Sequence, residues 1–93
     1  MSKNIQFLGG EIDFDHSRKC ATVPALVDGK RVVCIVSDRL LMERFRAASD
    51  NIGDLKKAYY AGEHAIQETS RELIEAGEIT DKAEVLITSE TFR

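Results

Sequence analysis

The sequence predicts an α+β domain in which an antiparallel three-stranded meander precedes a short helix, a long helix and a C-terminal strand, in the order β-β-β-α-α-β. Three observations support this fold class: an Asp-Gly pair joins two runs rich in β-branched residues, apolar residues at helical spacing follow, and a short aliphatic run lies near the end of the chain. The 93 residues are expected to form one domain, spanning 1–93. A domain of this size buries roughly 60 to 65% of its unfolded surface.

The central element is a β-hairpin around Asp28-Gly29, between the runs 23–27 and 30–36. Asp-Gly fits the two positive-φ positions of a type I′ turn, whose twist matches that of the flanking strands. This turn pairs Val27 with Lys30, Ala25 with Val32 and Val23 with Cys34. Because side chains alternate along a strand, one hairpin face is expected to be the core face. It carries Ala21, Val23, Ala25, Val27, Val32, Cys34 and Val36, and the other face carries Cys20, Thr22, Pro24, Leu26, Arg31, Val33, Ile35 and Ser37.

Pro24 constrains what lies beside this hairpin. Proline has no backbone N–H, and in this register the missing donor points away from the hairpin partner. A neighbouring strand on that side must therefore be absent or interrupted at Pro24. We expect a preceding strand around 11–14, turning through 15–18, with Gly9-Gly10 at about the level of Pro24. The resulting meander has Pro24 near its open edge.

A short helix is expected after Ser37, which is suited to the N-cap position. The apolar residues Leu40, Leu41, Phe45 and Ala48 follow helical spacing rather than alternation. Turn-favouring residues at 49–53 end this helix.

A second, long helix is expected from a cap at Asp54 to about Ala76, with Gly77 at the C′ position. Its apolar stripe comprises Leu55, Tyr59, Gly62, Ile66, Thr69 and Leu73. About 23 residues would extend ~35 Å, the length of the domain. The run 84–88 then predicts a final strand, which its consecutive aliphatic residues indicate to be covered on both faces or placed at an interface.

Composition and charge are those of an ordinary globular protein, with 43% hydrophobic residues, 31% charged residues and a net charge of −3. The apolar run 5–8 is too short for a signal peptide, and no stretch approaches the roughly 18 apolar residues of a membrane span. We therefore expect a cytoplasmic protein. Cys20 and Cys34 fall on opposite hairpin faces, where a disulfide would require a bulge, so we expect reduced thiols. No metal-site spacing, phosphate-binding loop or cofactor motif is present in the sequence.

Two groups of residues resemble chemical sites. On a strand, Glu11, Asp13 and Asp15 would share one face and could approach a divalent cation, but no second ligand segment accompanies them, and a solvated carboxylate row is favoured. On the long helix, Tyr60 and His64 would line up with Glu68 at four-residue spacing. Charged neighbours favour a solvated helix face there, with a binding surface or a small enzyme site as the alternatives.

Charge is unevenly distributed along the chain. Residues 1–47 contain eight Lys and Arg against six Asp and Glu, and residues 48–93 contain five against ten. The basic residues that could form a local patch are Lys30, Arg31, Arg39, Arg44 and Arg46. Nucleic-acid binding through this patch is a minority alternative, because a pI near 5.3 disfavours contact with many phosphates.

Short motifs along the chain are Ile5-Gln6-Phe7, Pro24-Ala25-Leu26-Val27-Asp28-Gly29, Cys34-Ile35-Val36-Ser37, Ile74-Glu75-Ala76-Gly77, and Val85-Leu86-Ile87-Thr88 with Phe92. Together they resemble a small bacterial family of uncharacterised proteins, domain of unknown function 1488, over nearly the whole chain. The resemblance implies a compact, stand-alone α+β bacterial protein without an assigned activity and without site residues to carry over. The segment Phe45-Arg46-Ala47-Ala48 departs from the family by its more positive charge, which concerns only this loop.

The function favoured by these observations is that of a non-catalytic interaction or regulatory module. An opposite-sign pair of surfaces on one small domain favours pairing between copies or docking on a partner. The meander edge and the apolar last strand are the elements that a second chain could cover, in a homodimer or in a complex with another protein. Tyr60, His64, Arg39, Arg44 and Arg46 are the candidate binding residues, and no catalytic residue, metal ligand or cofactor is predicted.

Overall fold

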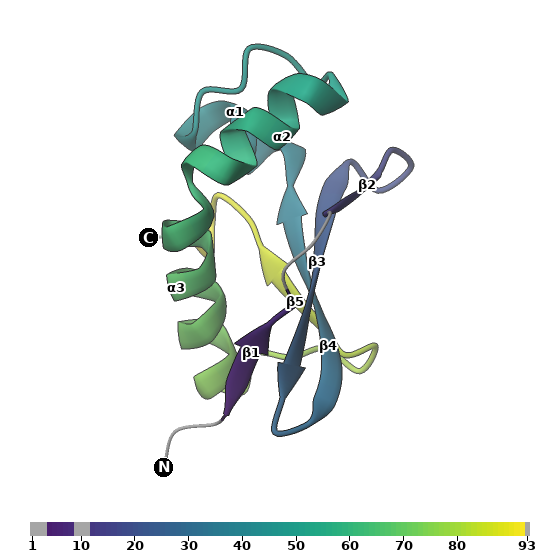
Figure 1. The fold of residues 1–93 in the computed structure, drawn as a ribbon, viewed down its shortest axis with the longest axis vertical. Helices are drawn as coiled ribbons and strands as arrows, with labels where there is room; N and C mark the ends of the chain where they lie inside the picture. Colours follow the sequence, from purple (N-terminus) through teal and green to yellow (C-terminus); the bar gives the residue numbers. More distant parts are fainter. Residues whose placement is uncertain (1–3, 9–11, 93) are drawn as a thin grey trace.

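The computed structural model describes residues 4–8 and 12–92, which form a sheet with one helix across a face and two helices at one end (Figure 1). The strands are β1 (Ile5–Phe7), β2 (Asp13–Asp15), β3 (Cys20–Val27), β4 (Lys30–Ser37) and β5 (Glu84–Ile87). The helices are α1 (Asp38–Arg44), α2 (Ile52–Ala61) and α3 (Glu63–Glu75). The predicted α+β class is confirmed. The order of elements differs in two places, because β1 is an additional strand before the meander and the predicted long helix is bent into α2 and α3.

The hairpin has the predicted register. Val27 pairs with Lys30, Ala25 with Val32 and Val23 with Cys34. Asp28 and Gly29 have φ values of 52° and 84°, as the turn requires. The predicted core face is confirmed, since all of its residues are buried: Ala21, Val23, Ala25, Val27, Val32, Cys34 and Val36.

The neighbouring strand is interrupted at Pro24, as predicted. β1 pairs antiparallel with residues 25–27 at the end of β3. β2 pairs antiparallel with residues 20–22 at the beginning of β3. Leu8 N–H donates to the Pro24 carbonyl at 3.1 Å, a bond that makes no demand on the proline nitrogen. The expected strand around 11–14 is therefore β2 at 13–15, and β1 is an additional strand. The expected Gly9-Gly10 break lies outside the described residues.

The short helix α1 begins as predicted and ends earlier. The Ser37 hydroxyl accepts a hydrogen bond from Leu40 N–H at 3.0 Å, which is the N-cap interaction. Phe45 is the C-cap, and its N–H donates to Leu41 O at 3.2 Å. Arg46 then takes a positive φ of 57°, so the helix does not continue to Ala48.

The prediction of a single long helix from Asp54 to Ala76 is wrong, because the chain bends at Gly62 between α2 and α3 (Figure 1). The aromatic ring of Phe45 occupies the space beside Gly62, where a Cβ atom would lie 2.3 Å from Phe45 Cε1. The glycine therefore admits the ring at the point where the helix changes direction. The N-cap also differs: Asn51 Oδ1 accepts from Gly53 N–H at 2.9 Å, and Asp54 instead accepts from the Ser49 hydroxyl at 2.7 Å.

The helix end at Gly77 is confirmed. Gly77 has a φ of 81°, its N–H donates to Ile74 O at 3.0 Å, and Glu78 N–H donates to Leu73 O at 2.9 Å. These two bonds form the Schellman motif, in which a left-handed residue at C′ satisfies carbonyls of the last turn. The chain is thereby turned back toward β5.

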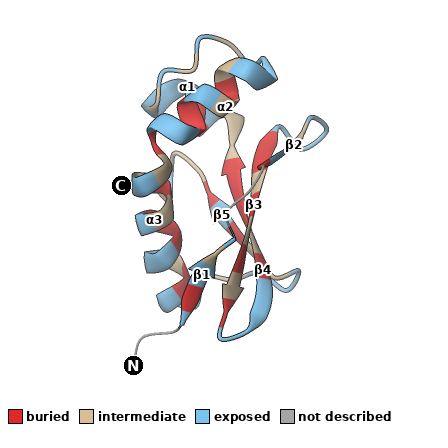
Figure 2. Ribbon diagram, viewed as in Figure 1, coloured by how far each residue is buried: buried red, intermediate tan, exposed pale blue. Residues whose placement is uncertain are grey.

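The final strand β5 lies beside β4 and runs parallel to it, giving the strand order β1-β3-β4-β5 with β2 also on β3. Val85 and Ile87 are fully buried, whereas Leu86 between them is 43% exposed. Coverage of both faces, one of the two situations predicted for this strand, is therefore not found. Figure 2 shows the reason: the buried side of α3 is directed toward one face of the sheet, and its exposed side faces away.

An ion pair connects the β2–β3 turn to the beginning of β5. Arg18 Nη1 and Nη2 donate to Glu84 Oε2 and Oε1 at 2.7 and 3.0 Å. Because β4 lies between β3 and β5, Arg18 reaches over β4, on the sheet face that Glu84 shares with Val33. The hydrogen bonds from Arg18 lower the pKa of the Glu84 carboxyl below its ordinary value.

Gly62→Ala is expected to lower the free energy of unfolding by about 1 to 3 kcal/mol, because overpacking against Phe45 outweighs a helix-propensity gain of up to ~1 kcal/mol. Chemical denaturation measures this change. In the Phe45→Ala background, the same glycine substitution should be neutral or stabilising, because the clashing ring is absent. An equal loss of stability in both backgrounds would show that the ring is not the reason for the glycine.

Glu84→Gln is expected to destabilise the protein at neutral pH and progressively less in acid. The folded state holds the Glu84 pKa below the ordinary value of 4.5, so the ion pair stabilises the fold above that pH and is lost as the pH falls through the lowered pKa. Urea midpoints measured across this range test the prediction. Glu68→Gln is the matched control, because its His64 partner lies 3.9 Å away on an exposed surface. If Glu84→Gln lowers the free energy of unfolding equally at every pH, packing of the side chain and not its charge is the source of its stabilising effect.

Candidate functional site

The most distinctive surface is the sheet face opposite α3, which none of the described helices covers (Figure 1). A free face of an antiparallel sheet ordinarily presents polar side chains to water. Here apolar side chains occupy its middle. We call this surface the open sheet face and define it by Leu8, Pro24, Leu26, Val33, Ile35 and Leu86. Leu8 and Leu86 are exposed, Ile35 is buried, and the other three residues are half-buried.

The register brings these residues together from four strands. Leu86 on β5 pairs with Ile35 on β4, and Leu8 extends β1 to the level of Pro24 on β3. Leu86 is 43% exposed and Leu8 is 39% exposed. The sequence analysis selected only the last strand of this surface, as an element that a second chain could cover. The signal for the rest was present, because the non-core face of the hairpin is itself rich in aliphatic residues.

Charged residues lie at opposite corners of the open sheet face. Arg31 on β4 is paired in register with Leu26, and Asp13 on β2 is paired with Thr22. Both charged side chains are on exposed residues, and neither has an ion-pair partner among the described residues. The surface thus has apolar side chains in its middle with the Arg18–Glu84 ion pair beside them, a cation at one corner and an anion at the other.

Hydrogen bonds with Thr80 and Thr91 occupy backbone groups on the outer edge of β5. Thr80 N–H donates to Glu84 O at 2.9 Å, and Glu84 N–H donates to Thr80 Oγ1 at 3.2 Å. Further along the strand, the Thr91 hydroxyl donates to Leu86 O at 3.0 Å. These bonds occupy backbone groups that another strand would need for pairing.

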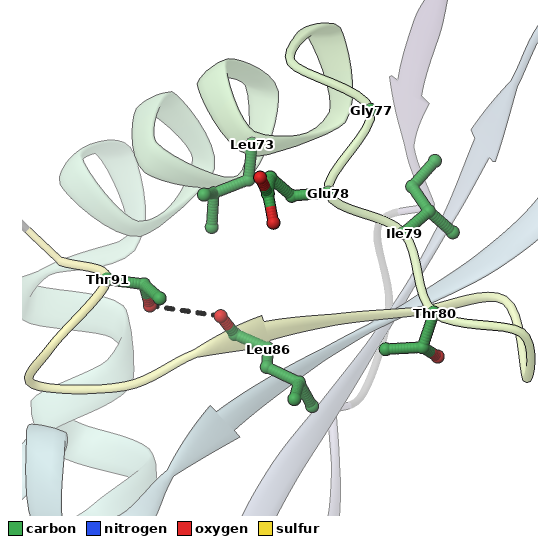
Figure 3. A pocket seen from close by; sticks show the side chains of 7 residues that line it. All are labelled: Leu73, Gly77, Glu78, Ile79, Thr80, Leu86 and Thr91. Atoms are coloured by element: carbon green, nitrogen blue, oxygen red, sulfur yellow. Dashed lines mark hydrogen bonds between the residues drawn. The ribbon is translucent and has the colours of Figure 1, made fainter.

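A cavity of about 250 Å³ lies between this capped edge and the end of α3 (Figure 3). It is lined by Leu73, Gly77, Glu78, Ile79, Thr80, Leu86 and Thr91. In Figure 3 the Leu86 side chain points away from α3, and its carbonyl faces Thr91. The lining includes one carboxylate, two threonine hydroxyls and neither histidine nor cysteine, so it offers no base beside a hydroxyl other than that one carboxylate.

Tyr60 and His64 do not form the predicted row. Tyr60 lies on α2 and His64 on α3, on either side of the bend at Gly62, and no hydrogen bond joins them among the described residues. The Tyr60 ring packs edge-to-face on Tyr59, with centroids 5.4 Å apart. The His64 side chain is 92% exposed, with Glu68 at 3.9 Å. Both side chains are exposed to solvent and extend from different helices.

Two of the candidate arginines already have partners within the fold. Arg39 Nε donates to Glu43 Oε2 at 2.9 Å, which lowers the pKa of the Glu43 carboxyl. The Arg44 guanidinium lies 5.9 Å from the centre of the Phe92 ring, a cation–π contact. Phe92 in turn packs edge-to-face on Phe45. Arg44 therefore helps to hold the C-terminal segment against the bend.

The predicted basic patch is divided between two ends of the sheet. Lys30 and Arg31 begin β4, and Arg39, Arg44 and Arg46 follow its other end. A strand of eight residues separates the two groups by roughly 26 Å. Arg46 lines a hollow that also contains Lys57 and Asp54.

The carboxylate row is only partly described. Asp13 and Asp15 lie on the same sheet face, as predicted, and Glu11 lies outside the described residues. Asp15 accepts hydrogen bonds from the Ser17 hydroxyl and from the N–H groups of Ser17 and Arg18, which lower its pKa. No group of three potential metal ligands occurs in the described part of the chain.

Both cysteines are free and buried. Burial raises the pKa of the Cys34 thiol, partly offset by a hydrogen bond with Ser70. Burial also raises the pKa of Cys20, although the Arg18 charge acts in the opposite direction. Neither environment favours the reactive thiolate.

Comparison with known proteins places this fold in a family. No helix in the described ranges has the length and apolar character needed to cross a membrane. No curated protein matches the chain. The chain is similar to a crystal structure from Shewanella loihica PV-4, described as a protein of unknown function from the DUF1488 family, with a TM-score of 0.80, 18% sequence identity and 94% of each chain covered. The model of the family "Protein of unknown function (DUF1488)" matches residues 5–93, and the chain therefore belongs to this family.

Proposed function

We propose that this protein is a non-catalytic interaction module that binds a protein partner on its open sheet face. The observation that carries the proposal is the row of aliphatic side chains in the middle of a face that no described helix covers. Leu86 and Leu8, at 43% and 39% exposure, are among the large hydrophobic residues most exposed to water. Removing such side chains from water is the main source of affinity in protein complexes.

A catalytic role has less support. The cavity beside β5 contains a single carboxylate, and Tyr60 and His64 extend from different helices. Nucleic-acid binding also has less support, because the arginines are divided between two ends of the sheet and the net charge is −3. Both remain outcomes of the test below.

A bacterial, cytoplasmic setting is part of the proposal. The similar structure comes from Shewanella loihica PV-4, and the two cysteines form no disulfide, which suits a reducing compartment.

Leu86→Glu is expected to abolish partner binding, because it places a charge in the middle of the docking surface. Tagged protein is used to capture partners from bacterial lysate with and without nuclease treatment, and retained proteins are quantified by mass spectrometry. Ile52→Glu is the matched control: Ile52 is 42% exposed, undergoes the same chemical change, and lies on α2 away from this face. The control should retain the partner, and thermal melts establish that both variants are folded.

Equal retention by the two variants would overturn the assignment of the surface. Loss of all captured material on nuclease treatment would favour nucleic acid instead. If neither condition captures a partner, and no copy-to-copy complex forms, the interaction-module proposal fails and small-ligand binding near Tyr60 and His64 becomes the next hypothesis.

A further inference from the structure

We infer that the partner on the open sheet face is a second copy of this chain, packed face to face about a two-fold axis so that Arg31 of each copy lies against Asp13 of the other. This inference rests on the proposed function and names its partner. It differs from the sequence-based expectation of a homodimer, which placed the contact at the meander edge or at the last strand and named neither the face nor the charged contacts.

The strand edges are poor places for a second copy. At the β5 edge, Thr80 and Thr91 already occupy the carbonyls of Glu84 and Leu86 and the N–H of Glu84. At the opposite edge, β1 and β2 are each three residues long and are separated by the interruption at Pro24. Continuous pairing of a further strand needs a longer run of free backbone groups. The face of the sheet is therefore the surface left for association.

The charges on this face complement a copy of themselves. Arg31 and Asp13 lie on strands that flank β3 on opposite sides, and their register positions differ by four residues along β3. They are therefore roughly 10 Å apart across the sheet and roughly 13 Å apart along it, at opposite corners. A two-fold axis parallel to the face and perpendicular to the line joining them exchanges the two corners. Each cation then meets the anion of the other copy, in two symmetric contacts.

The centre of the face suits the same arrangement. Aliphatic residues from β3, β4 and β5, with Leu8 after β1, lie between the charged corners. The charges of Arg18 and Glu84 on this face neutralise each other in their ion pair. Burying that pair adds no unpaired charge. The five strands hold 26 residues and cover roughly 400 Å² in projection on each copy. Two copies therefore bring together roughly 800 Å², near the lower limit of roughly 1,000 Å² for a specific interface. Two sheets packed in this way lie about 10 Å apart.

Sedimentation equilibrium of the purified full chain at up to roughly 100 μM tests the inference, because a dimer with a Kd below this concentration is the main species there. We expect a dimer for the wild type. Asp13→Arg and Arg31→Asp should each weaken dimerisation at least tenfold, since either reversal creates two like-charged contacts. Glu68→Arg, a reversal on the exposed surface of α3, should leave the dimer unchanged.

Two restorations distinguish this geometry from a loss of folding. The double variant D13R/R31D should dimerise again, because its charges are exchanged together. An equimolar mixture of the D13R and R31D single variants should form a heterodimer. One copy then carries a cation at both corners and the other carries an anion at both, so each of the two contacts pairs opposite charges. A structural effect of either substitution would not be repaired by mixing.

A monomeric wild type at roughly 100 μM overturns the inference, as does a dimer that is insensitive to both charge reversals or to Leu86→Glu. The result remains separable from the proposed function. If the wild type is monomeric but Leu86→Glu still loses a captured protein that Ile52→Glu retains, the surface is a docking site for a different protein. If both measurements are insensitive to Leu86→Glu, the inference and the proposed function fail together.

Discussion

The register of the β3–β4 hairpin is the constraint on which the other parts of this structure depend. Asp28 and Gly29 take the positive φ values of the turn and thereby decide which residues of each strand point to α3 and which point to the open sheet face. β1 and β2 attach to the outer side of β3, and β5 attaches to the outer side of β4. A slip of one residue would exchange the two faces of the hairpin and expose the core residues to water. The register of every strand in the sheet therefore depends on the turn formed by Asp28 and Gly29.

Features fixed by short-range chemistry could be predicted from the sequence. The hairpin register follows from the turn, and the beginning of α1 follows from the Ser37 hydroxyl. The end of α3 follows from the ability of Gly77 to take a positive φ. The interruption opposite Pro24 follows from a missing N–H group. In each case the cause and the effect lie within a few residues of each other or across a single strand pair.

Features fixed by distant contacts could not be predicted in this way. The apolar stripe continues through Gly62, so periodicity gives one helix, and the bend depends on the Phe45 ring, which comes from the loop after α1. The parallel pairing of β5, the Thr80 and Thr91 caps on its edge, and the Arg18–Glu84 ion pair join segments that the sequence separates widely.

Most of the candidate site was missed for a related reason. Only its last strand had been named from the sequence as an element that a second chain could cover. The selected residues Tyr60, His64, Arg39, Arg44 and Arg46 are chemically conspicuous, whereas the open sheet face consists of ordinary aliphatic residues. These residues can be recognised as a possible binding surface only when it is known that α3 covers the other face of the sheet (Figure 2). Leu86 is the clearest case: within the sequence it looks like one more core residue of a buried strand, and in the fold it is 43% exposed.

The parallel placement of β5 also has a consequence for the order of folding. β3 and β4 are adjacent in the sequence and can pair through a local turn, whereas three helices separate β4 from β5 along the chain. Closing so long a loop costs conformational entropy, so contacts between β4 and β5 are expected to form more slowly than those within the hairpin. Until they form, the edge of β4 that receives residues 84–87 is unpaired and open to pairing with other chains.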